Sequence, residues 1–223
     1  MDAPDELADL PYADLLRRYD GPLETEGDYD TVHIDGREFT GGAGNDAGGA
    51  RFLESAVTDC VLDGTGLRKA RMNDLWLSGT RLTGATLAES TWLDSALVGC
   101  SLAGVEAFSA VLHRMVLRRC KLDSVNLRGA SLREVVFEDC VLRDVDFGEA
   151  RFDRVAFPGS RIERARLGRA QLKRTDLRGA VTVELADGYD ALRGAVISSA
   201  QLLDLAPALA AALGITVKDE QGR

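Results

Sequence analysis

Four cysteines and two histidines are the residues of this 223-residue chain best suited to metal binding or redox chemistry. Such side chains hold zinc when they converge, usually through closely spaced pairs such as two cysteines two residues apart. No such pair occurs, because multiples of 20 residues separate Cys60, Cys100, Cys120 and Cys140. The two histidines, His33 and His113, lie at unrelated phases of that spacing. The sequence therefore predicts no metal and no cofactor.

A glycine-rich segment, "GGAGNDAGG" at residues 41–49, has the composition of a phosphate-binding loop. Such a loop needs a helix directly after it, and here a strand-like pattern follows. The segment is expected to be a flexible loop. Because the chain also lacks a convergent nucleophile and base, we expect no enzyme activity.

Large apolar residues recur every fifth position along the middle of the chain. From Phe52 to Leu177 there are 26 such positions, and 25 hold Leu, Phe, Ile, Val, Met or Trp, with Ala107 as the exception. The residue two places earlier is small everywhere except at Leu75 and Met115. A helix would repeat near 3.6 residues and a half-buried strand at 2, so neither explains the pattern.

A fixed short period indicates a solenoid, in which each unit buries its apolar side only by stacking on its neighbours. Glycine often lies two places after the large residue, where a tight turn favours it. The four cysteines all take the small inward site and fall in one column, whose other levels are Thr80, Ser160 and Ala180. Packing by size explains them better than a redox role, which stays the alternative.

The repeat resembles the pentapeptide-repeat family, whose consensus is A(D/N)LXX. The closest matches are "VNLRG" at 125–129, "VDFGE" at 145–149 and "TDLRG" at 175–179, and the resemblance covers about 130 of 223 residues. It implies a right-handed quadrilateral β-helix with four repeats in each coil, so 26 repeats make about 6.5 coils. The expected fold is an all-β solenoid with a C-terminal α-helical cap.

The chain is expected to divide into an acidic, partly helical N-terminal arm (1–33), a β-helix (34–198), a C-terminal helix (199–214) and a tail (215–223). The regular ladder spans 50–179. Before it, Ile34 and Phe39 are again five apart, and they predict an atypical capping coil with Arg37 at an inward site. After Leu177 the ladder is interrupted at Thr182 and Asp187 and resumes at Leu192 and Ile197, the last two residues of the ladder before the helix.

The C-terminal helix is predicted from its capping residues and its apolar period. Ser198 or Ser199 can cap it and Gly214 can end it, while Pro207 would kink it or start a second short helix. Its apolar stripe consists of Leu202, Leu205, Leu209 and Leu213. In several relatives such a helix joins two rods, so this stripe predicts a homodimer; a cap folded on its own last coil is the alternative.

The resemblance also implies a function, because the best-known branch of the family is formed by quinolone-resistance proteins. These acidic dimeric rods mimic DNA and bind DNA gyrase or topoisomerase IV. The chain has a net charge of −9, but residues 1–50 carry 3 basic and 13 acidic groups whereas residues 51–180 carry 21 and 17. Opposite charges alternate along most columns of the predicted rod. Only the column with Glu54, Asp74 and Asp94 forms an acidic stripe resembling that of a DNA mimic.

An apolar strip is also predicted on the outside of the rod. It consists of outward positions one residue before the large ones, with one neighbouring site: Ala56, Trp76, Ala96, Val98, Val116, Val136 and Ala156. An exposed apolar strip of this kind usually has a partner. That partner is either a foreign protein or the chain's own segment 6–19, read as an amphipathic helix.

The sequence thus predicts a non-enzymatic protein-binding β-helix, with no direct contact to nucleic acid or membrane. Two hypotheses remain: a modulator of gyrase or topoisomerase linked to antibiotic resistance, or a scaffold that binds another bacterial protein through the apolar strip. A cytoplasmic location is expected, since there is no run of about 18 apolar residues and no signal-like N-terminus. The candidate partner-binding residues are Glu54, Asp74, Asp94, Trp76, Val98 and Val116.

Overall fold

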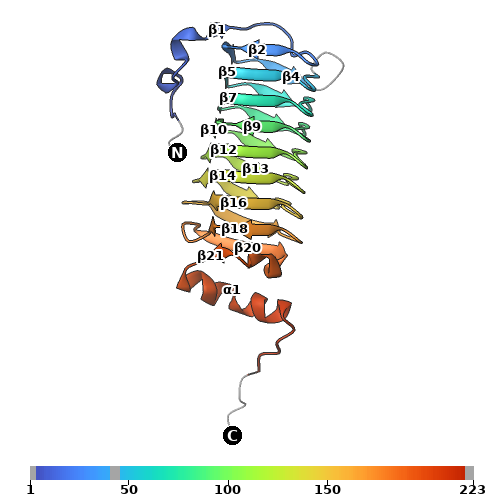
Figure 1. Ribbon diagram of the computed structural model, residues 1–223, viewed down its shortest axis with the longest axis vertical. Coiled ribbons are helices and arrows are strands. Elements are labelled where there is room, and N and C mark those ends of the chain that lie inside the picture. The colour runs from blue at the N-terminus through green and yellow to red at the C-terminus, as the bar shows by residue number, and fades with distance from the viewer. Residues whose placement is uncertain (1–3, 41–45, 219–223) are drawn as a thin grey trace.

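The large residues of the five-residue ladder all point into one continuous core. The computed structural model describes residues 4–40 and 46–218. All 26 ladder positions from Phe52 to Leu177 are buried, and so are the 26 small positions that lie two residues before them. The chain winds into a parallel β-solenoid that ends in one helix (Figure 1). The predicted all-β solenoid with a helical C-terminal cap is confirmed.

A left-handed residue at each corner makes the period five. The positions two after each large residue, from Glu54 to Arg174, all have positive φ, whether or not they hold glycine. Gly99 adopts φ 62° without strain, whereas Asp94 at φ 52° is less favourable. Stacking offsets the cost of this left-handed conformation, because the backbone N–H of each corner residue donates a hydrogen bond to the next coil. The Asp94 N–H donates to His113 O at 3.1 Å, and the Gly99 N–H donates to Arg118 O at 2.8 Å.

Two of the four sides of the rod belong to one 13-stranded sheet. Its longer strands turn a corner and so contribute to both sides: β5 (Arg51–Thr58), β7 (Arg71–Ser78), β12 (Val111–Arg118), β14 (Ser131–Glu138) and β16 (Arg151–Ala156). The first side is completed by β2 (Asp28–Asp30), β9 (Thr91–Leu93) and β18 (Gln171–Lys173). The second side is completed by β1 (Arg17–Arg18), β3 (Val32–Asp35), β10 (Ala96–Val98), β19 (Thr175–Asp176) and β21 (Ala195–Val196).

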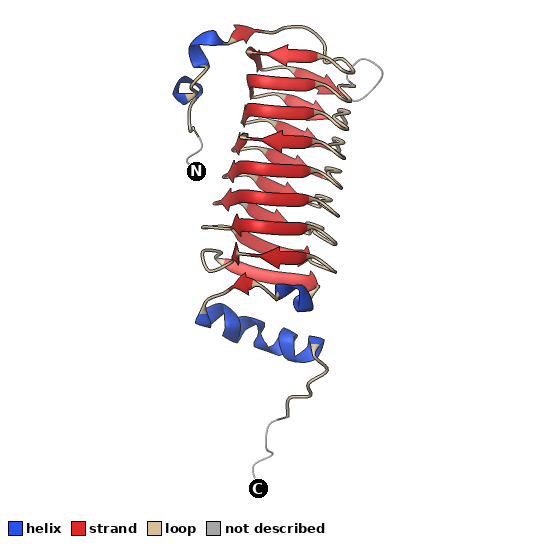
Figure 2. Ribbon diagram, viewed as in Figure 1, coloured by secondary structure: helices blue, strands red, loops and turns tan. Residues whose placement is uncertain are grey.

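The third side is an eight-stranded sheet with one strand from each coil (Figure 2). Its strands are β4 (Glu38–Thr40), β6 (Val61–Asp63), β8 (Arg81–Thr83), β11 (Ser101–Ala103), β13 (Lys121–Asp123), β15 (Val141–Arg143), β17 (Arg161–Arg166) and β20 (Thr182–Asp187). The fourth side is a series of single bridges from Asp46 to Arg166. Partners along the regular coils are 20 residues apart, as Leu122, Leu142 and Ile162 illustrate. Irregular coils at both ends extend the rod beyond the regular ladder.

The first coil begins at Asp28, earlier than the predicted start at residue 34, because Tyr29 already pairs with Phe52 in the sheet. Ile34 and Phe39 are buried as expected of a capping coil. Strand partners here are 23 residues apart, as in Phe39 and Leu62. The Arg37 side chain avoids the core: its guanidinium stacks over the Phe39 ring at 5.6 Å and donates to the Asp20 carbonyl.

The predicted loop at 41–49 is only partly a loop. Residues 41–45 lie outside the described residues. Asp46 bridges Gly66 at the regular spacing of 20, and Ala47 is fully buried. Residues 46–49 therefore belong to the fourth side, and the extra residues of this coil fall between Thr40 and Asp46. The sequence pattern missed them because Ala47 takes a ladder position with a small side chain.

The last coil contains register shifts instead of an interruption. Arg161 pairs with Thr182 and Ile162 with Val183, at a spacing of 21. This shift turns Val183 toward the core in place of Thr182, whereas Leu185 pairs with Ala165 at the regular spacing of 20 before the register shifts again at Asp187. A short 3₁₀-helix, η3 (Tyr189–Leu192), follows, and β21 restores the spacing of 20.

The helix α1 (Ser199–Ala212) runs across the end of the last coil. Ser198 caps it, accepting from Gln201 N–H at 3.2 Å and donating its own N–H to the Gln201 side chain at 2.9 Å. The Gln201 amide also donates to Leu177 O at 2.7 Å, which ties the helix to the rod. The helix continues through Pro207 without a break, so the alternative of a second short helix is wrong.

The N-terminal arm does not form the predicted helix over 6–19. It contains two 3₁₀-helices, η1 (Leu7–Asp9) and η2 (Ala13–Leu15), and then β1, which pairs with β3. Pro11 lies between the two short helices, where it supplies no N–H for a continuous α-helix. In Figure 2 the arm descends along the outside of the rod.

Candidate protein-binding surfaces

The apolar strip on the second side is covered by the N-terminal arm. Leu10 and Tyr12 of the arm are buried against Trp76 and Val116, in a small cluster separate from the main core. The remaining buried members of this cluster are Ala56, Ala96 and Val98. Of the two partners that the sequence left open for this strip, the structure has the internal one.

Polar contacts fix the arm at both ends of the strip. The Tyr12 hydroxyl donates to Asp74 O at 2.6 Å, and the Trp76 indole N–H donates to Pro4 O at 3.1 Å. Asp5 forms ion pairs with Arg118 at 3.1 Å and Arg119 at 2.8 Å. Hydrogen bonds from Arg119 and Arg118 lower the pKa of Asp5, whereas burial, with Asp74 and Glu54 nearby, raises the pKa of Tyr12.

This cover changes the reading of three candidate residues. Trp76, Val98 and Val116 are buried, so none of them is free to meet a foreign protein while the arm is docked. A Trp76→Glu variant would expel the arm and would not test partner binding alone. The sequence offered this cover as one of two alternatives but could not decide between them, because an arm without a regular helix has no periodic signal to match to the strip.

The acidic stripe lies beside the docked arm. Glu54, Asp74 and Asp94 are successive corner residues of one column, and Arg114 is the next. Asp94 is paired with Arg114 at 2.5 Å, and this hydrogen-bonded pair lowers the pKa of Asp94. Burial, with Asp94 and Glu54 nearby, raises the pKa of Asp74. Within the described residues no cation lies within ion-pair distance of Glu54 or Asp74, so two of the three carboxylates carry unbalanced charge.

The charge of the rod changes sign along its length. Residues 4–110 contain 8 basic and 19 acidic groups, whereas residues 111–178 contain 16 basic and 10 acidic groups. Opposite charges on neighbouring coils form ion pairs at Arg118–Glu138, Arg143–Glu163, Arg154–Glu134, Arg164–Asp144 and Arg169–Glu149. Two further charged residues pair elsewhere, because Arg119 pairs with Asp5 of the arm and Asp146 pairs with Arg128.

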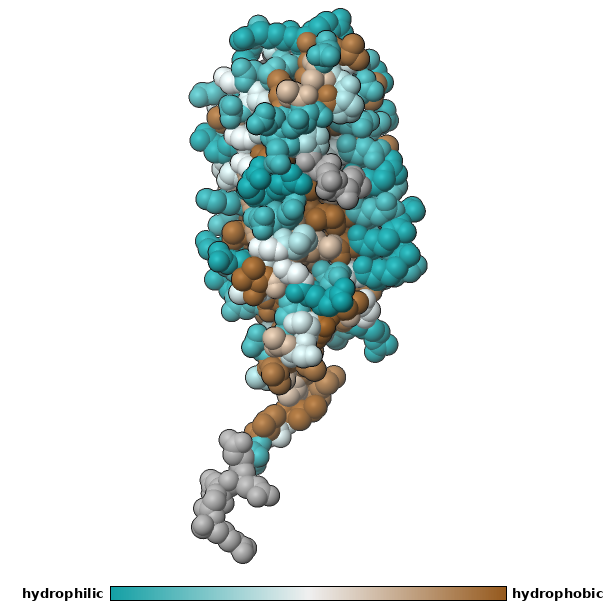
Figure 3. Space-filling view, turned by 90° about the vertical axis from the view of Figure 1, so that its left-hand side faces the viewer, coloured by the Kyte–Doolittle hydropathy of each residue, from teal (hydrophilic) through white to brown (hydrophobic). Residues whose placement is uncertain are grey.

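Exposed apolar side chains gather at the C-terminal end (Figure 3). Of the nine large hydrophobic residues that are exposed in the described part of the chain, seven lie between residues 181 and 217: Val181, Val196, Leu202, Leu203, Leu213, Ile215 and Val217. In the predicted stripe of α1, only Leu205 is buried and Leu209 is half-buried. Leu202 and Leu213 remain exposed, so α1 covers the last coil only in part.

A groove of about 440 Å³ opens between β20 and α1. Its lining combines apolar residues with three carboxylates, from Glu163, Glu184 and Asp204. A second surface groove of about 420 Å³ is lined mainly by charged residues of the first coils, among them Asp28, Arg51 and Arg71. Three smaller cavities lie within the core, are lined almost entirely by apolar side chains and hold about 20–40 Å³ each. In residues 4–40 and 46–218 no group of three His, Cys, Asp or Glu side chains could hold a metal ion. No helix in these ranges is long and apolar enough to span a membrane.

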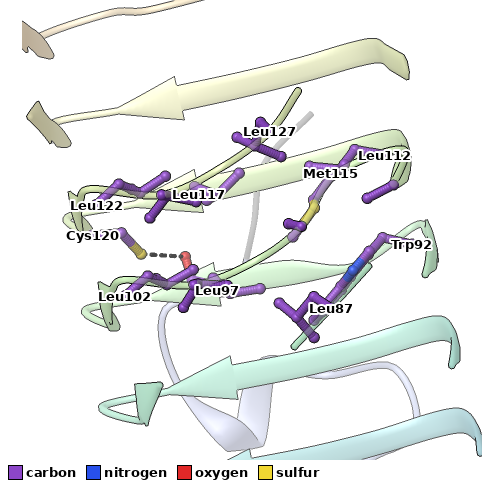
Figure 4. Close-up of a cluster of buried hydrophobic side chains, with 14 of the residues drawn as sticks. Leu87, Trp92, Leu97, Leu102, Leu112, Met115, Leu117, Cys120, Leu122 and Leu127 are labelled. Atoms are coloured by element: carbon purple, nitrogen blue, oxygen red, sulfur yellow. Dashed lines mark hydrogen bonds between the residues drawn. The ribbon is translucent and has the colours of Figure 1, made fainter. Parts of the chain in front are cut away.

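The cysteine column has a structural role in the wall. The four thiols are free and buried, and each is within contact distance of backbone carbonyls, as Cys120 Sγ is of Leu97 O at 3.4 Å (Figure 4). Cys120 N–H in turn approaches Cys140 Sγ at 3.4 Å, and Cys140 N–H donates to Ser160 Oγ at 2.9 Å. Burial raises the pKa of Cys60. A small side chain that can both donate and accept a hydrogen bond suits the levels that hold Cys, Thr80 and Ser160. This favours a packing role over redox chemistry.

Comparison with protein families supports the repeat assignment. Residues 110–185 match a family described as a pentapeptide repeat region. No curated protein sequence matches the chain.

Solved structures to which the chain is similar at low sequence identity include pentapeptide-repeat proteins. One is HetL, a protein involved in heterocyst differentiation regulation from the cyanobacterium Nostoc sp. strain PCC 7120. Its sequence is 18% identical to this chain. The match covers 81% of this chain and 93% of HetL, with a TM-score of 0.43. Full-length QnrB1, a plasmid-mediated fluoroquinolone resistance protein, is 17% identical, with 85% and 100% covered and a TM-score of 0.32. A protein from the Arabidopsis thaliana thylakoid lumen is 12% identical, with 58% and 73% covered and a TM-score of 0.34.

Proposed function

Because this chain is a pentapeptide-repeat protein, we propose that it is a non-enzymatic protein-binding rod that pairs end to end with a second copy of itself. The observation that carries this proposal is the concentration of exposed apolar residues at the C-terminal end. Leu203 is 76% exposed and Leu213 is 73% exposed, although the other apolar strip of the rod is covered. An uncovered apolar patch on an otherwise charged protein is typical of a binding surface.

A second copy fits this patch because a two-fold contact brings identical apolar surfaces together. The partly covered end of the solenoid supports the same conclusion, since the last coil and α1 would shield each other across the contact. The sequence predicted the helix stripe as the contact. The exposed residues extend that contact to Val181, Val196 and Leu203.

Deleting residues 199–223 tests this proposal. The truncated rod should be monomeric, or should aggregate through its open end, whereas the intact chain should be dimeric by light scattering. Leu203→Asp gives a milder test, because its side chain touches little of its own chain. It should yield a folded monomer, and Leu15→Asp, also an exposed leucine but at the other end of the rod, should leave the dimer intact. A dimer that survives Leu203→Asp would contradict the proposed contact.

A topoisomerase is the second candidate partner, and the acidic N-terminal half supports it. The acidic arm docks with Tyr12 beside Glu54 and Asp74, so the arm and the stripe both add negative charge to this end of the rod. Such a surface is what a protein that binds DNA would meet, so the contact should weaken with salt and compete with duplex DNA. The Arg-rich coils 151–178 should not take part.

A supercoiling assay with purified gyrase tests this second candidate, with and without a quinolone. Wild-type protein should alter supercoiling at micromolar concentration, and the triple variant Glu54→Ala, Asp74→Ala, Asp94→Ala should not. Replacing Arg161 and Arg166, which lie on the later coils, by Ala is the matched control and should keep the effect. If the wild-type protein has no effect, the topoisomerase candidate fails and a scaffold for another bacterial protein remains.

A cytoplasmic location is consistent with four free thiols.

A further inference from the structure

The groove between β20 and α1 has an apolar floor and an acidic rim. Leu205 on one wall is 4% exposed and Val183 on the other is half-buried, while Val181 at the edge is 61% exposed. The carboxylates of Glu184 and Asp204 stand on opposite walls, and Glu163 on β17, which is paired with Arg143, lies beside them. An occupant would therefore need apolar side chains for the floor and a cation for the rim.

The C-terminal tail carries this combination of side chains. After Gly214, which takes φ 71°, the chain continues as Ile215, Thr216, Val217 and Lys218 outside any helix or strand. Ile215 and Val217 are exposed, and an extended segment would direct both to one side. Lys218 is the first basic residue after Arg193, and Asp219 and Glu220 follow it in the sequence. The tail leaves the far end of α1 and points away from the rod (Figure 1).

The apolar residues of the tail cannot fill the groove of their own chain. The chain advances nine residues from Leu205 to Gly214, about 13 Å at the helical rise of 1.5 Å per residue. Val217 lies three residues beyond Gly214 and can reach about 10–11 Å along a fully extended chain. A tail that turned back would therefore leave Ile215 and Val217 short of Leu205.

We propose that the tail of a second copy occupies this groove, so that the two chains of the dimer exchange their C-terminal segments. This inference rests on the end-to-end dimer proposed above. Ile215 and Val217 pack on Val181 and Val183 of the other chain, and the Lys218 ammonium lies between the carboxylates of Glu184 and Asp204. A two-fold axis makes the exchange reciprocal, so each copy both supplies a tail and receives one.

Cysteine cross-linking tests the exchange directly, because the four native thiols are buried. Chains carrying Val217→Cys are mixed with chains carrying Val181→Cys, allowed to exchange subunits and treated with a mild oxidant. A disulfide-linked heterodimer of the two variants is expected. Val61→Cys, on β6 in the same sheet but six strands from β20, replaces Val181→Cys in the matched control and should not cross-link to Val217→Cys.

A charge exchange provides a second test that does not depend on cross-linking. Lys218→Glu should weaken the dimer up to about fivefold, as expected for one exposed ion pair, and adding Glu184→Lys should restore the affinity. Val217→Asp should weaken the dimer on the order of 10- to 100-fold, because the apolar contact is lost.

Three results would overturn the exchange. The first is an intact dimer that neither cross-links between Val217→Cys and Val181→Cys nor weakens in Val217→Asp; it would leave the end-to-end pairing in place with the tail outside it. The second is a disulfide within one chain in the Val181→Cys, Val217→Cys double variant at high dilution, which would assign the groove to the chain's own tail. The third is a monomeric intact protein, which would remove the dimer and the exchange together.

Discussion

The docked arm gives a stability prediction that a matched pair of leucines can test. Leu10, on the side of the arm that faces the rod, is 6% exposed, whereas Leu15 in the same arm is 60% exposed. Truncating Leu10 to Ala removes three buried carbon atoms, which at about 0.8 kcal/mol each amounts to roughly 2 kcal/mol. Since 1.4 kcal/mol is a tenfold change, the ratio of docked to undocked arm should fall about 30-fold. Leu15→Ala should change this ratio little.

Tryptophan fluorescence can follow the arm, because the chain has only two tryptophans. Trp76 lies under the arm with its indole N–H bonded to Pro4 O, and Trp92 lies inside the core. In a Trp92→Phe background, the emission of Trp76 therefore reports the cover. Leu10→Ala should shift this emission to longer wavelength and increase quenching by acrylamide, while Leu15→Ala should match the parent.

The reasoning would be refuted if Leu10→Ala and Leu15→Ala gave equal emission, or if Trp76 were already solvent-exposed in the parent. The first result would mean that Leu10 contributes nothing to docking. The second would return the apolar strip to the surface and revive Trp76, Val98 and Val116 as contacts for a foreign protein.

Three further predictions concern the wall and the core. Leu142→Asp should lower the melting temperature strongly, because a carboxylate would be buried between coils, whereas outward Arg143→Asp should be mild; equal melting temperatures would contradict the inward assignment. Arg114 lowers the pKa of Asp94, so the stability from this pair is present above the unfolded pKa near 3.9 and is lost as the pH falls through the lower folded pKa. The variant Arg114→Ala should therefore lose less melting temperature than the wild type between pH 5 and 2. An unchanged pH profile of the melting temperature would exclude this linkage. The ionised Asp74 carboxylate lowers stability, because the pKa of Asp74 is raised in the folded state. Asp74→Asn should therefore raise the melting temperature at pH 7 but not below pH 3. A lower melting temperature of Asp74→Asn at pH 7 would show that the charge is not unfavourable there.

The five-residue period was sufficient to predict the solenoid and its inward residues. The pattern depends on one local unit, in which a small and a large residue point inward and a left-handed corner residue follows. Each coil repeats this unit, and residues close together in the sequence are enough to specify it. Phe52 to Leu177 could therefore be assigned without knowledge of the rest of the chain.

The ends were less predictable, because single insertions and small side chains hide the register there. The register shift in the last coil moves Val183 inward, and Ala47 occupies a ladder position without the expected bulk. The arm was predicted as an apolar segment able to lie on the strip, but its 3₁₀ conformation depends on contacts with Trp76 and Asp74 that are distant in sequence. The groove between β20 and α1 likewise arises only when both elements are placed.

The molar mass of the intact protein, measured by light scattering over a range of concentrations, tests the central claim of a rod that pairs through its C-terminal end. The account predicts twice the chain mass of 24.0 kDa, and a return to 24.0 kDa for Leu203→Asp at the same concentration. An intact protein that stays at 24.0 kDa up to high concentration would contradict the account, because the exposed apolar end would then have no second copy to cover it.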